Sequence, residues 1–147
     1  MYKRILVPTD GSTLSKKAVK SAIELAASIG AEVVAVNVVP RYPMSYFEGG
    51  ANVSGAEVAR VEKLWAEQGQ SFADDVGKAA GKAGVKSKAT TVRSDLVAEA
   101  ILAAAKKNRC DLIVMASHGR KGLRRLLLGS ETQHVLTHGN IPVLVLR

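Results

Sequence analysis

The sequence predicts an α/β fold: a single doubly wound domain over residues 1–147, with a five-stranded parallel sheet (strand order 3-2-1-4-5) and helices on both faces. Short, continuous apolar runs alternate along the chain with longer segments of helical periodicity, which is the pattern of strand–helix–strand units. The strands are apolar on both sides, as in a parallel sheet that helices cover on both faces. A length of 147 residues fits one compact domain.

The first strand, the first helix and the second strand follow one another directly. Apolar runs at residues 3–9 and 33–39 predict two buried strands. Between them, apolar residues recur at helical spacing from Leu14 to Ile29, and Gly30 is placed to end the helix. The sequence therefore predicts a β–α–β unit with parallel strands.

The middle of the chain combines a loop with a long helix. Residues 40–53 include two prolines and two glycines, and they predict an irregular loop. Ser54 and Glu57 form a capping box at the start of the helix that follows. Trp65 and Phe72 fall on the apolar stripe of this helix, so we expect them in the core rather than on a stacking platform.

Two further strands enclose the third helix. Residues 85–92 alternate in polarity and predict an edge strand, whereas the purely apolar run at 112–116 predicts a central one. Ser94 or Asp95 is expected to cap the helix between them.

The last part of the chain predicts a loop, a helix and an edge strand. The loop is expected to contain a helical turn at 123–128, and Ser130 with Gln133 forms a second capping box. The final strand, 141–146, contains Pro142, which cannot donate a hydrogen bond to a neighbouring strand. We therefore expect this strand at the edge of the sheet.

The charge of the chain favours an anionic partner. There are 21 Lys and Arg against 13 Asp and Glu, a net charge of +8. Aromatic residues make up only 4 %, and proteins that bind single-stranded nucleic acid commonly stack bases on aromatic side chains. The composition therefore argues against nucleic acid and favours a small anion.

Two general features bound the location of the protein and its metal chemistry. No apolar run approaches the ~20 residues that cross a bilayer, and no secretory leader follows Met1, so we expect a cytoplasmic protein without membrane insertion. Cys110 is the single cysteine, which excludes an internal disulfide and any multi-cysteine metal site.

A ligand is expected where the strand order reverses. In open parallel sheets, ligands bind beyond the carboxyl ends of the strands at this reversal, here between the first and fourth strands. Polar residues and a glycine follow these two strands, namely Pro8, Thr9 and Asp10 after the first and Ser117, His118 and Gly119 after the fourth. Asp10 is the carboxylate of this crevice.

The loop after the fourth strand predicts a phosphate site. Gly119 and Gly129 enclose nine residues, and Ser130 follows at the start of the last helix, where free backbone N–H groups and the helix dipole attract phosphate. The loop contains the basic residues Arg120, Lys121, Arg124 and Arg125. Neither GxxxxGK[ST] nor GxGxxG is present, so this is neither a Walker A loop nor a dinucleotide-binding fingerprint.

Three motifs together resemble the universal stress protein family over the whole chain. The loop is similar to that family's nucleotide signature, Gly-x2-Gly-x9-Gly-Ser/Thr, with Ala116 at the position of the first glycine. The opening segment 5–12 (ILVPTDGS) and the closing segment 141–145 (IPVLV) are also similar to the family.

The resemblance implies a homodimeric module that binds ATP, which Mg can accompany, and that acts in stress response or signalling. Adenine would lie against Asp10 and the backbone of Val38, and the phosphates would meet Gly119, Gly129 and Ser130. The full set of predicted binding residues is Pro8, Thr9, Asp10, Val38, Met115, Ala116, Ser117, His118, Gly119, Arg120, Gly122, Gly129, Ser130 and Glu131. The dimer would form through the edge strand Ile141–Leu146, and a regulatory protein is a further possible partner.

The sequence leaves two alternatives to this interpretation open. Ala116 carries a Cβ that the signature lacks, so a nucleotide-free dimeric interaction protein of the same fold is one alternative. A slow ATP hydrolase is another, although Asp10 and His118 have no visible orienting partner and the sequence does not favour an enzyme. His134 and His138 lie four apart on the last helix, but no third metal ligand is visible, which favours a solvated helix face.

Overall fold

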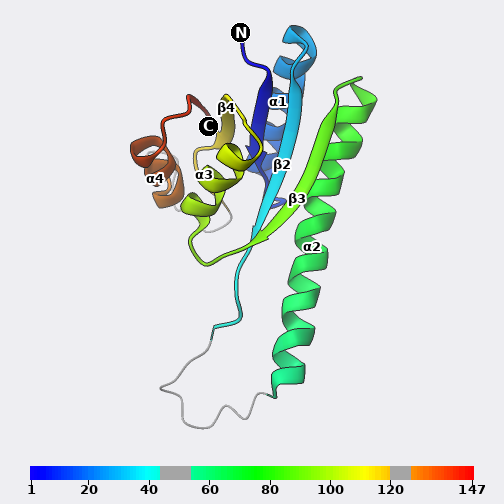
Figure 1. The fold of residues 1–147 in the computed structure, drawn as a ribbon, viewed down its shortest axis with the longest axis vertical. Coiled ribbons are helices and arrows are strands. Elements are labelled where there is room, and N and C mark those ends of the chain that lie inside the picture. The colour runs from blue at the N-terminus through cyan, green and yellow to red at the C-terminus, as the bar shows by residue number, and fades with distance from the viewer. Residues whose placement is uncertain (44–53, 120–126) are drawn as a thin grey trace.

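A computed structural model describes residues 1–43, 54–119 and 127–147 of the chain. The elements, in order, are β1 (Arg4–Pro8), α1 (Thr13–Ile29), β2 (Glu32–Val39), α2 (Gly55–Lys82), β3 (Ser87–Arg93), α3 (Val97–Lys107), β4 (Leu112–Ala116), α4 (Ser130–His138) and β5 (Val143–Leu146) (Figure 1). They form a parallel five-stranded sheet in the order β3-β2-β1-β4-β5. The predicted fold class and strand order are confirmed.

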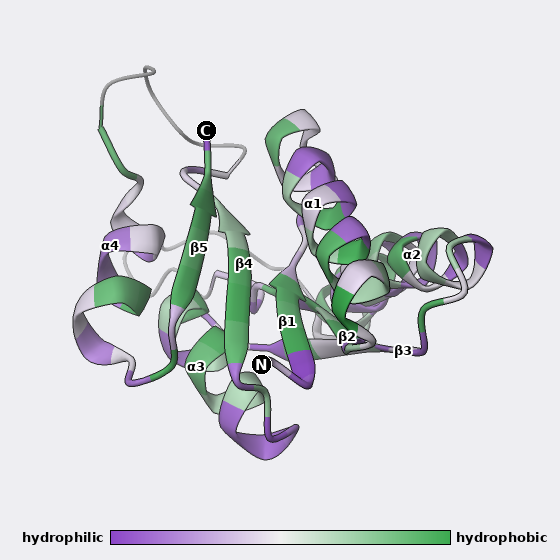
Figure 2. Cartoon of the chain, turned by 90° about the horizontal axis from the view of Figure 1, so that it is seen from above, coloured by the Kyte–Doolittle hydropathy of each residue, from purple (hydrophilic) through white to green (hydrophobic). Residues whose placement is uncertain are grey.

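Helices cover both faces of the sheet. Helices α1 and α2 lie on one side and α3 and α4 on the other (Figure 2). Successive side chains of a strand point to opposite faces, so each central strand contributes to two apolar clusters. On β4, Val114 belongs to the α1–α2 cluster and Ile113 to the α3–α4 cluster, both fully buried.

The predicted helix starts are partly correct. Ser12 caps α1 by accepting a hydrogen bond from the Ser15 N–H, and Ser54 caps α2 in the same way through the Glu57 N–H. Gly30 ends α1 in the left-handed conformation, at φ 70°. The interactions at Ser54 and Gly30 are local, so sequence spacing alone was sufficient to predict them.

The predicted caps of α3 and α4 are wrong. The N-cap residue of α3 is Leu96, because Ser94 Oγ accepts the Leu96 N–H within the preceding turn and Asp95 accepts the Arg41 N–H. The N-cap residue of α4 is Gly129 rather than Ser130, and glycine has no side chain that could cap the helix. The predicted caps miss the true N-cap positions by one or two residues: Ser94 and Asp95 precede Leu96, and Ser130 follows Gly129.

The predicted strand ends also need correction. The third strand begins at Ser87 rather than at residue 85, and the fifth begins at Val143 rather than at residue 141. Pro142 precedes β5, where its carbonyl oxygen accepts the Ile113 N–H at 2.9 Å. Both β3 and β5 lie at the edges of the sheet, as predicted.

Helix α2 extends well beyond the carboxyl ends of the strands (Figure 1). Its buried residues begin only at Gly69, so the first half of the helix lies outside the core. Trp65 and Phe72 are half-buried and belong to neither apolar cluster, which makes the prediction that they are core residues wrong. Trp65 instead stacks on Tyr42, with ring centroids 6.1 Å apart.

Two predicted segments fall on residues outside the described ranges. They are most of the loop 40–53 and most of the helical turn 123–128. Within the described residues, no helix has both the length and the apolar character needed to cross a membrane.

Candidate functional site

The carboxyl ends of β1 and β4 meet at one edge of the sheet. The two strands pair directly, with Ile5 opposite Leu112 and Leu6 opposite Ile113. A Cβ built on Gly119 would lie 2.8 Å from Oδ2 of Asp10, so the carboxylate rests directly against the backbone of the β4 loop. The structure thus brings together the two strand ends that the sequence predicted to form the crevice.

Asp10 is held in a defined position at the start of α1. Its Oδ1 accepts a hydrogen bond from the Ser12 N–H at 2.9 Å. On its N-terminal side, buried Thr9 donates its N–H to the Val36 carbonyl at 2.9 Å, which continues the β1–β2 ladder beyond Pro8. On its C-terminal side, Gly11 turns the chain at φ +75°. The carboxylate is therefore fixed by its own turn.

Val38 presents its backbone to the crevice. The Val36 carbonyl accepts the N–H of the residue after β1, and the Val39 carbonyl accepts the N–H of the residue after β3. Because these groups alternate in direction along a strand, the N–H and C=O of Val38 point toward the β1 side. Because β1 ends at Pro8, opposite Val36, these groups lie beyond its end. This is the placement that a backbone contact with a ligand in the crevice requires.

Asn37 is a residue of this region that sequence reasoning missed. It is buried, and its Nδ2 donates to the Thr9 carbonyl at 2.7 Å, so it fastens the end of β2 to the end of β1. Gly69 of α2 lies against the Asn37 side chain so closely that no Cβ would fit. A single polar residue within the apolar run VVAVNVV was the available signal.

The start of α4 is fastened to the end of β4. The Gly129 N–H donates to the Ser117 carbonyl at 2.7 Å, and a Cβ on Gly129 would lie 3.2 Å from both that oxygen and the His118 Cα. Buried Thr132, which sequence reasoning also missed, donates its hydroxyl to the Ala116 carbonyl at 3.0 Å. Glycine at 129 therefore permits this close approach.

The N-terminus of α4 has the electrostatics of an anion site. The N-cap residue, Gly129, has no side chain that could cap the helix, and the positive end of the helix dipole lies beside the crevice. Ser130, at the first helical position, is exposed and adds a hydroxyl group. This arrangement can bind a phosphate group.

The remaining predicted residues differ in what their side chains do. Met115 and Ala116 are buried in the α3–α4 and α1–α2 clusters, so both side chains belong to the core. Ser117 is buried, and its hydroxyl lies 3.2 Å from Nδ1 of half-buried His118. Pro8 ends β1. Arg120 and Gly122 lie outside the described residues, as do Lys121, Arg124 and Arg125.

The Glu131 side chain bonds to α3, and its predicted ligand contact stays a prediction. Its Oε2 accepts a hydrogen bond from the Ala98 N–H at 2.9 Å, at the start of α3. A carboxylate at the N-terminus of a helix is favourable because it pairs with free N–H groups and with the dipole. Glu131 therefore serves as the cap that Ser94 and Asp95 were expected to provide.

The His and Cys side chains of the described ranges form no metal site. His134 and His138 stack at a centroid distance of 4.1 Å, and the structure brings together no group of three His, Cys, Asp or Glu across residues 1–43, 54–119 and 127–147. Cys110 is buried, and desolvation raises the pKa of its thiol to about 11. Its role is packing.

Comparison with known proteins places this geometry in a family context. Universal stress protein MJ0531 of Methanocaldococcus jannaschii is 39 % identical over 147 residues, covering 100 % of this chain and 83 % of that protein. The solved structure of MJ0577, from the same organism, superimposes with a TM-score of 0.82 at 29 % identity, covering 99 % of this chain and 96 % of that one.

Two more distant structures share the fold and were solved with nucleotides. A universal stress protein in complex with cAMP has a TM-score of 0.69 at 24 % identity, covering 99 % of this chain and 97 % of that chain. One from Archaeoglobus fulgidus in complex with dAMP has a TM-score of 0.65 at 17 % identity, covering 99 % and 98 %. The family model "Universal stress protein family" matches residues 1–147. The chain therefore belongs to the universal stress protein family.

Proposed function

We propose that this protein binds an adenine nucleotide, with ATP as the ligand, in the crevice between the ends of β1 and β4. The observation that carries the proposal is the close approach of Gly119 to Asp10 and of Gly129 to Ser117 and His118. These contacts bring the β1 turn, the β4 loop and the open N-terminus of α4 into one site.

The related structures support this ligand class. The family members solved with cAMP and dAMP hold ligands that share an adenine and a phosphate group. In the present chain, the carboxylate of Asp10 and the backbone of Val38 offer polar groups to the adenine. Gly129 and Ser130 offer the helix start to the phosphates, and Gly119 completes the loop.

Ala116 is compatible with this proposal. It replaces the first glycine of the signature, but its side chain is 9 % exposed and belongs to the α1–α2 apolar cluster. The methyl group packs in the core, and the Ala116 carbonyl is bound by Thr132. A nucleotide-free interaction protein therefore becomes an outcome of the test rather than the preferred function.

Magnesium would accompany ATP through its phosphates. Mg²⁺ usually binds one or two protein carboxylates together with substrate phosphates. Among the described residues, Asp10 is the carboxylate in the crevice, since the side chain of Glu131 lies at α3. We assign no hydrolytic step to these residues. The protein we propose is a binding module that acts in stress response or signalling in the cytoplasm. A regulatory protein is its proposed further partner.

The module would act as a homodimer through β5. This strand lies at the edge of the sheet, and Leu144 on it is 42 % exposed. An uncovered edge offers unpaired N–H and C=O groups to a further strand. A second copy of β5 would satisfy them.

Isothermal titration with ATP, AMP and cAMP tests the nucleotide site. Gly129→Glu should weaken binding at least tenfold, because its side chain meets Ser117 and His118 and adds negative charge at the helix start. Gly55→Glu is the matched control: it places the same side chain at the first position of α2, where a Cβ meets nothing within 4 Å.

A second variant guards against misfolding of Gly129→Glu. Asp10→Asn keeps the size of the side chain and the acceptor for the Ser12 N–H, so it should fold, yet bind nucleotide more weakly. Equal affinity of the wild type and Gly129→Glu, or no binding of any of the three nucleotides by the wild type, would overturn the proposal and favour the nucleotide-free interaction protein.

A further inference from the structure

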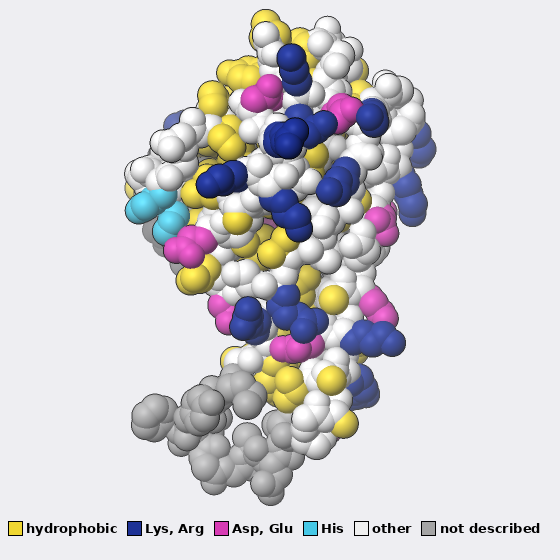
Figure 3. All heavy atoms as spheres, viewed as in Figure 1, with side chains coloured by type: hydrophobic (Ala, Val, Ile, Leu, Met, Phe, Trp, Pro, Cys, Tyr) yellow, Lys and Arg dark blue, Asp and Glu magenta, His cyan; other side chains and the backbone are white. Residues whose placement is uncertain are grey.

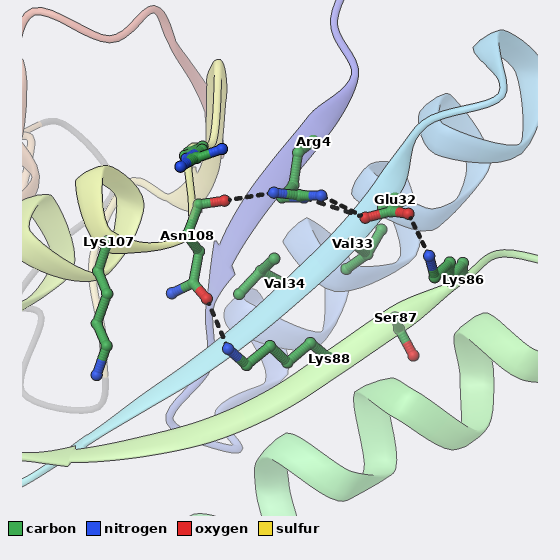
Figure 4. A pocket seen from close by; sticks show the side chains of 10 residues that line it. Arg4, Glu32, Val33, Val34, Lys86, Ser87, Lys88, Lys107 and Asn108 are labelled. Atoms are coloured by element: carbon green, nitrogen blue, oxygen red, sulfur yellow. Dashed lines mark hydrogen bonds and ion pairs between the residues drawn. The ribbon is translucent and has the colours of Figure 1, made fainter.

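A basic pocket lies at the opposite end of the sheet from the nucleotide crevice. It has a volume of about 500 Å³ and is formed where β1, β2 and β3 begin and where α3 turns into β4. Its lining comprises Arg4, Glu32, Val33, Val34, Lys86, Ser87, Lys88, Lys107, Asn108 and Arg109, most of which Figure 4 labels. On the outer surface, Lys and Arg side chains lie over this upper part of the molecule and also over its lower part (Figure 3).

The charges of this pocket are unbalanced. Its lining includes five cationic residues and one carboxylate, Glu32. Lys86 Nζ and the Arg4 guanidinium bond to that carboxylate at 2.8 and 2.9 Å, and these hydrogen bonds hold the pKa of Glu32 below its ordinary value. The single carboxylate of the lining thus pairs with two cations, and the remaining three cations, Lys88, Lys107 and Arg109, have no carboxylate partner among the described residues.

Those three cations are the feature that calls for a ligand. Lys88 Nζ donates to a neutral acceptor, Oδ1 of Asn108, at 2.9 Å. The side chains of Lys107 and Arg109 make no hydrogen bond or ion pair with any residue in the described part of the chain, although the Arg109 backbone N–H donates to the Lys106 carbonyl at 3.1 Å. Asp111, the next carboxylate along the chain, is bound by the backbone N–H groups of Lys3 and Arg4 at 2.8–3.1 Å.

The backbone at Arg109 shows that a cationic side chain stands where glycine would be favoured. Arg109 has φ 54°, the only positive φ of a non-glycine residue in the described ranges. It follows the end of α3, and the Cys110 N–H bonds to the Ala105 carbonyl at 2.8 Å, which is the geometry of a Schellman turn. This position usually carries glycine, because a Cβ there costs about 1 kcal/mol.

The frame around the unpaired cations is rigid. Figure 4 shows Arg4 extended between Glu32 on one side and Asn108 on the other. Its Nη1 donates to the Asn108 carbonyl at 2.8 Å, and Asn108 Nδ2 donates in turn to the Ala104 carbonyl at 2.8 Å. Beneath them, Val33 and Val34 are buried in the sheet. The pocket floor is thus fixed before any ligand arrives, which lowers the entropic cost of binding.

We propose that this pocket binds a compact anion carrying two or more phosphate groups. Lys88 lies on β3, Lys107 at the end of α3 and Arg109 in the turn before β4, so three cations without a carboxylate partner in the described ranges line one space of about 500 Å³. Arg and Lys are the side chains that recognise phosphate, Arg through its fork of N–H donors and Lys as a point charge. The lining contains no aromatic residue, so it offers no platform for nucleic-acid bases.

Titration calorimetry with tripolyphosphate at about 0.15 M ionic strength tests this site. The test variant is Lys107→Gln combined with Arg109→Gly, which removes two charges while giving the left-handed position its preferred residue. We therefore expect an unchanged or higher melting temperature, together with binding weakened at least tenfold. The matched control, Lys20→Gln with Lys63→Gln, removes the same charge from exposed positions of α1 and α2.

The outcomes separate this site from the crevice. Loss of tripolyphosphate binding in the test variant alone, with ATP binding retained, supports the proposal. Equal loss in the control, no binding by the wild type, or loss in Gly129→Glu instead would overturn it, the last by assigning the anion to the crevice. Tighter binding of a single-stranded oligonucleotide, lost in the same test variant, would also overturn it and identify nucleic acid as the occupant.

Discussion

Gly11 shows how one residue fixes the β1 side of the crevice. Its φ of +75° lies in the left-handed region, and a Cβ at this position would overlap the ring of Phe72. Both constraints exclude a side chain, and together they set the turn that holds Asp10 beside Gly119. The sequence shows a glycine in a turn, but the packing of Phe72 from α2 appears only in the folded molecule.

Cys110 yields a prediction at the same scale. Burial raises the pKa of its thiol to about 11, so at pH 8 only about one thiol in a thousand is ionised. We expect no reaction with iodoacetamide in the native protein at pH 8 and complete reaction in denaturant, measured by mass spectrometry. Rapid labelling of the native protein would show that the thiol is accessible and contradict its burial.

The link between α4 and α3 is the clearest example at the scale of elements. Glu131 lies in the first turn of α4, yet its carboxylate accepts the Ala98 N–H of α3. The start of one helix thus supports the start of another, across a separation of 33 residues in sequence. An edge of the nucleotide crevice is thereby tied to a helix that contributes no predicted ligand contact.

Glu131→Ala should destabilise the protein by about 0.5–2 kcal/mol, the usual cost of losing a helix cap. Urea denaturation measures this as a lower midpoint with an unchanged slope. Glu131→Gln, which keeps an oxygen acceptor, should lose less. Equal midpoints for the alanine variant and the wild type would show that the Ala98 hydrogen bond contributes nothing.

Local sequence patterns predicted the helices and strands well, whereas contacts between residues far apart in sequence could not be predicted. The strand at 112–116 was predicted with its exact bounds because its five residues are all buried, so the apolar run and the strand coincide. The cap of α2 was correct because it pairs Ser54 with Glu57, three residues apart. The caps of α3 and α4 failed because Ala98 bonds to distant Glu131, and because Ser130 is the first residue of α4 while Gly129 is its N-cap.

At the scale of the whole molecule, the location of the crevice was predictable while part of its construction was not. The strand order alone places the ends of β1 and β4 together, and the contact between Asp10 and Gly119 is consistent with that expectation. Asn37 and Thr132 escaped notice because each bonds to a backbone carbonyl of another element. The basic pocket combines residues from four segments of the chain, so no local sequence motif could predict it.

The proposed dimer gives a prediction at this scale. The carbonyls of Pro142 and Leu146 bond to β4, so alternation directs the N–H groups of Val143 and Val145 to the open edge. Val145→Pro should therefore leave the β4–β5 ladder intact while removing a donor that a second chain would use. We expect a single-chain mass by analytical ultracentrifugation where the wild type gives twice that mass.

Leu144→Pro is the matched control for this experiment. The N–H of Leu144 faces β4, so its loss should lower the melting temperature, which Val145→Pro should leave nearly unchanged. A Val145→Pro protein that still sediments as two chains would show that the chains associate through some other surface.

Because α2 extends beyond the sheet, the length of this helix can change without affecting the stability of the core. Burial within the helix starts at Gly69, and the ties from its first half to the described body are the Tyr42–Trp65 stack and the hydrogen bonds that Glu62 accepts from Tyr42 and Arg93. Turns added or removed before Glu62 would change how far the helix reaches past the sheet without opening either apolar cluster. Proteins built on this sheet can thus vary their reach at this end with little thermodynamic penalty.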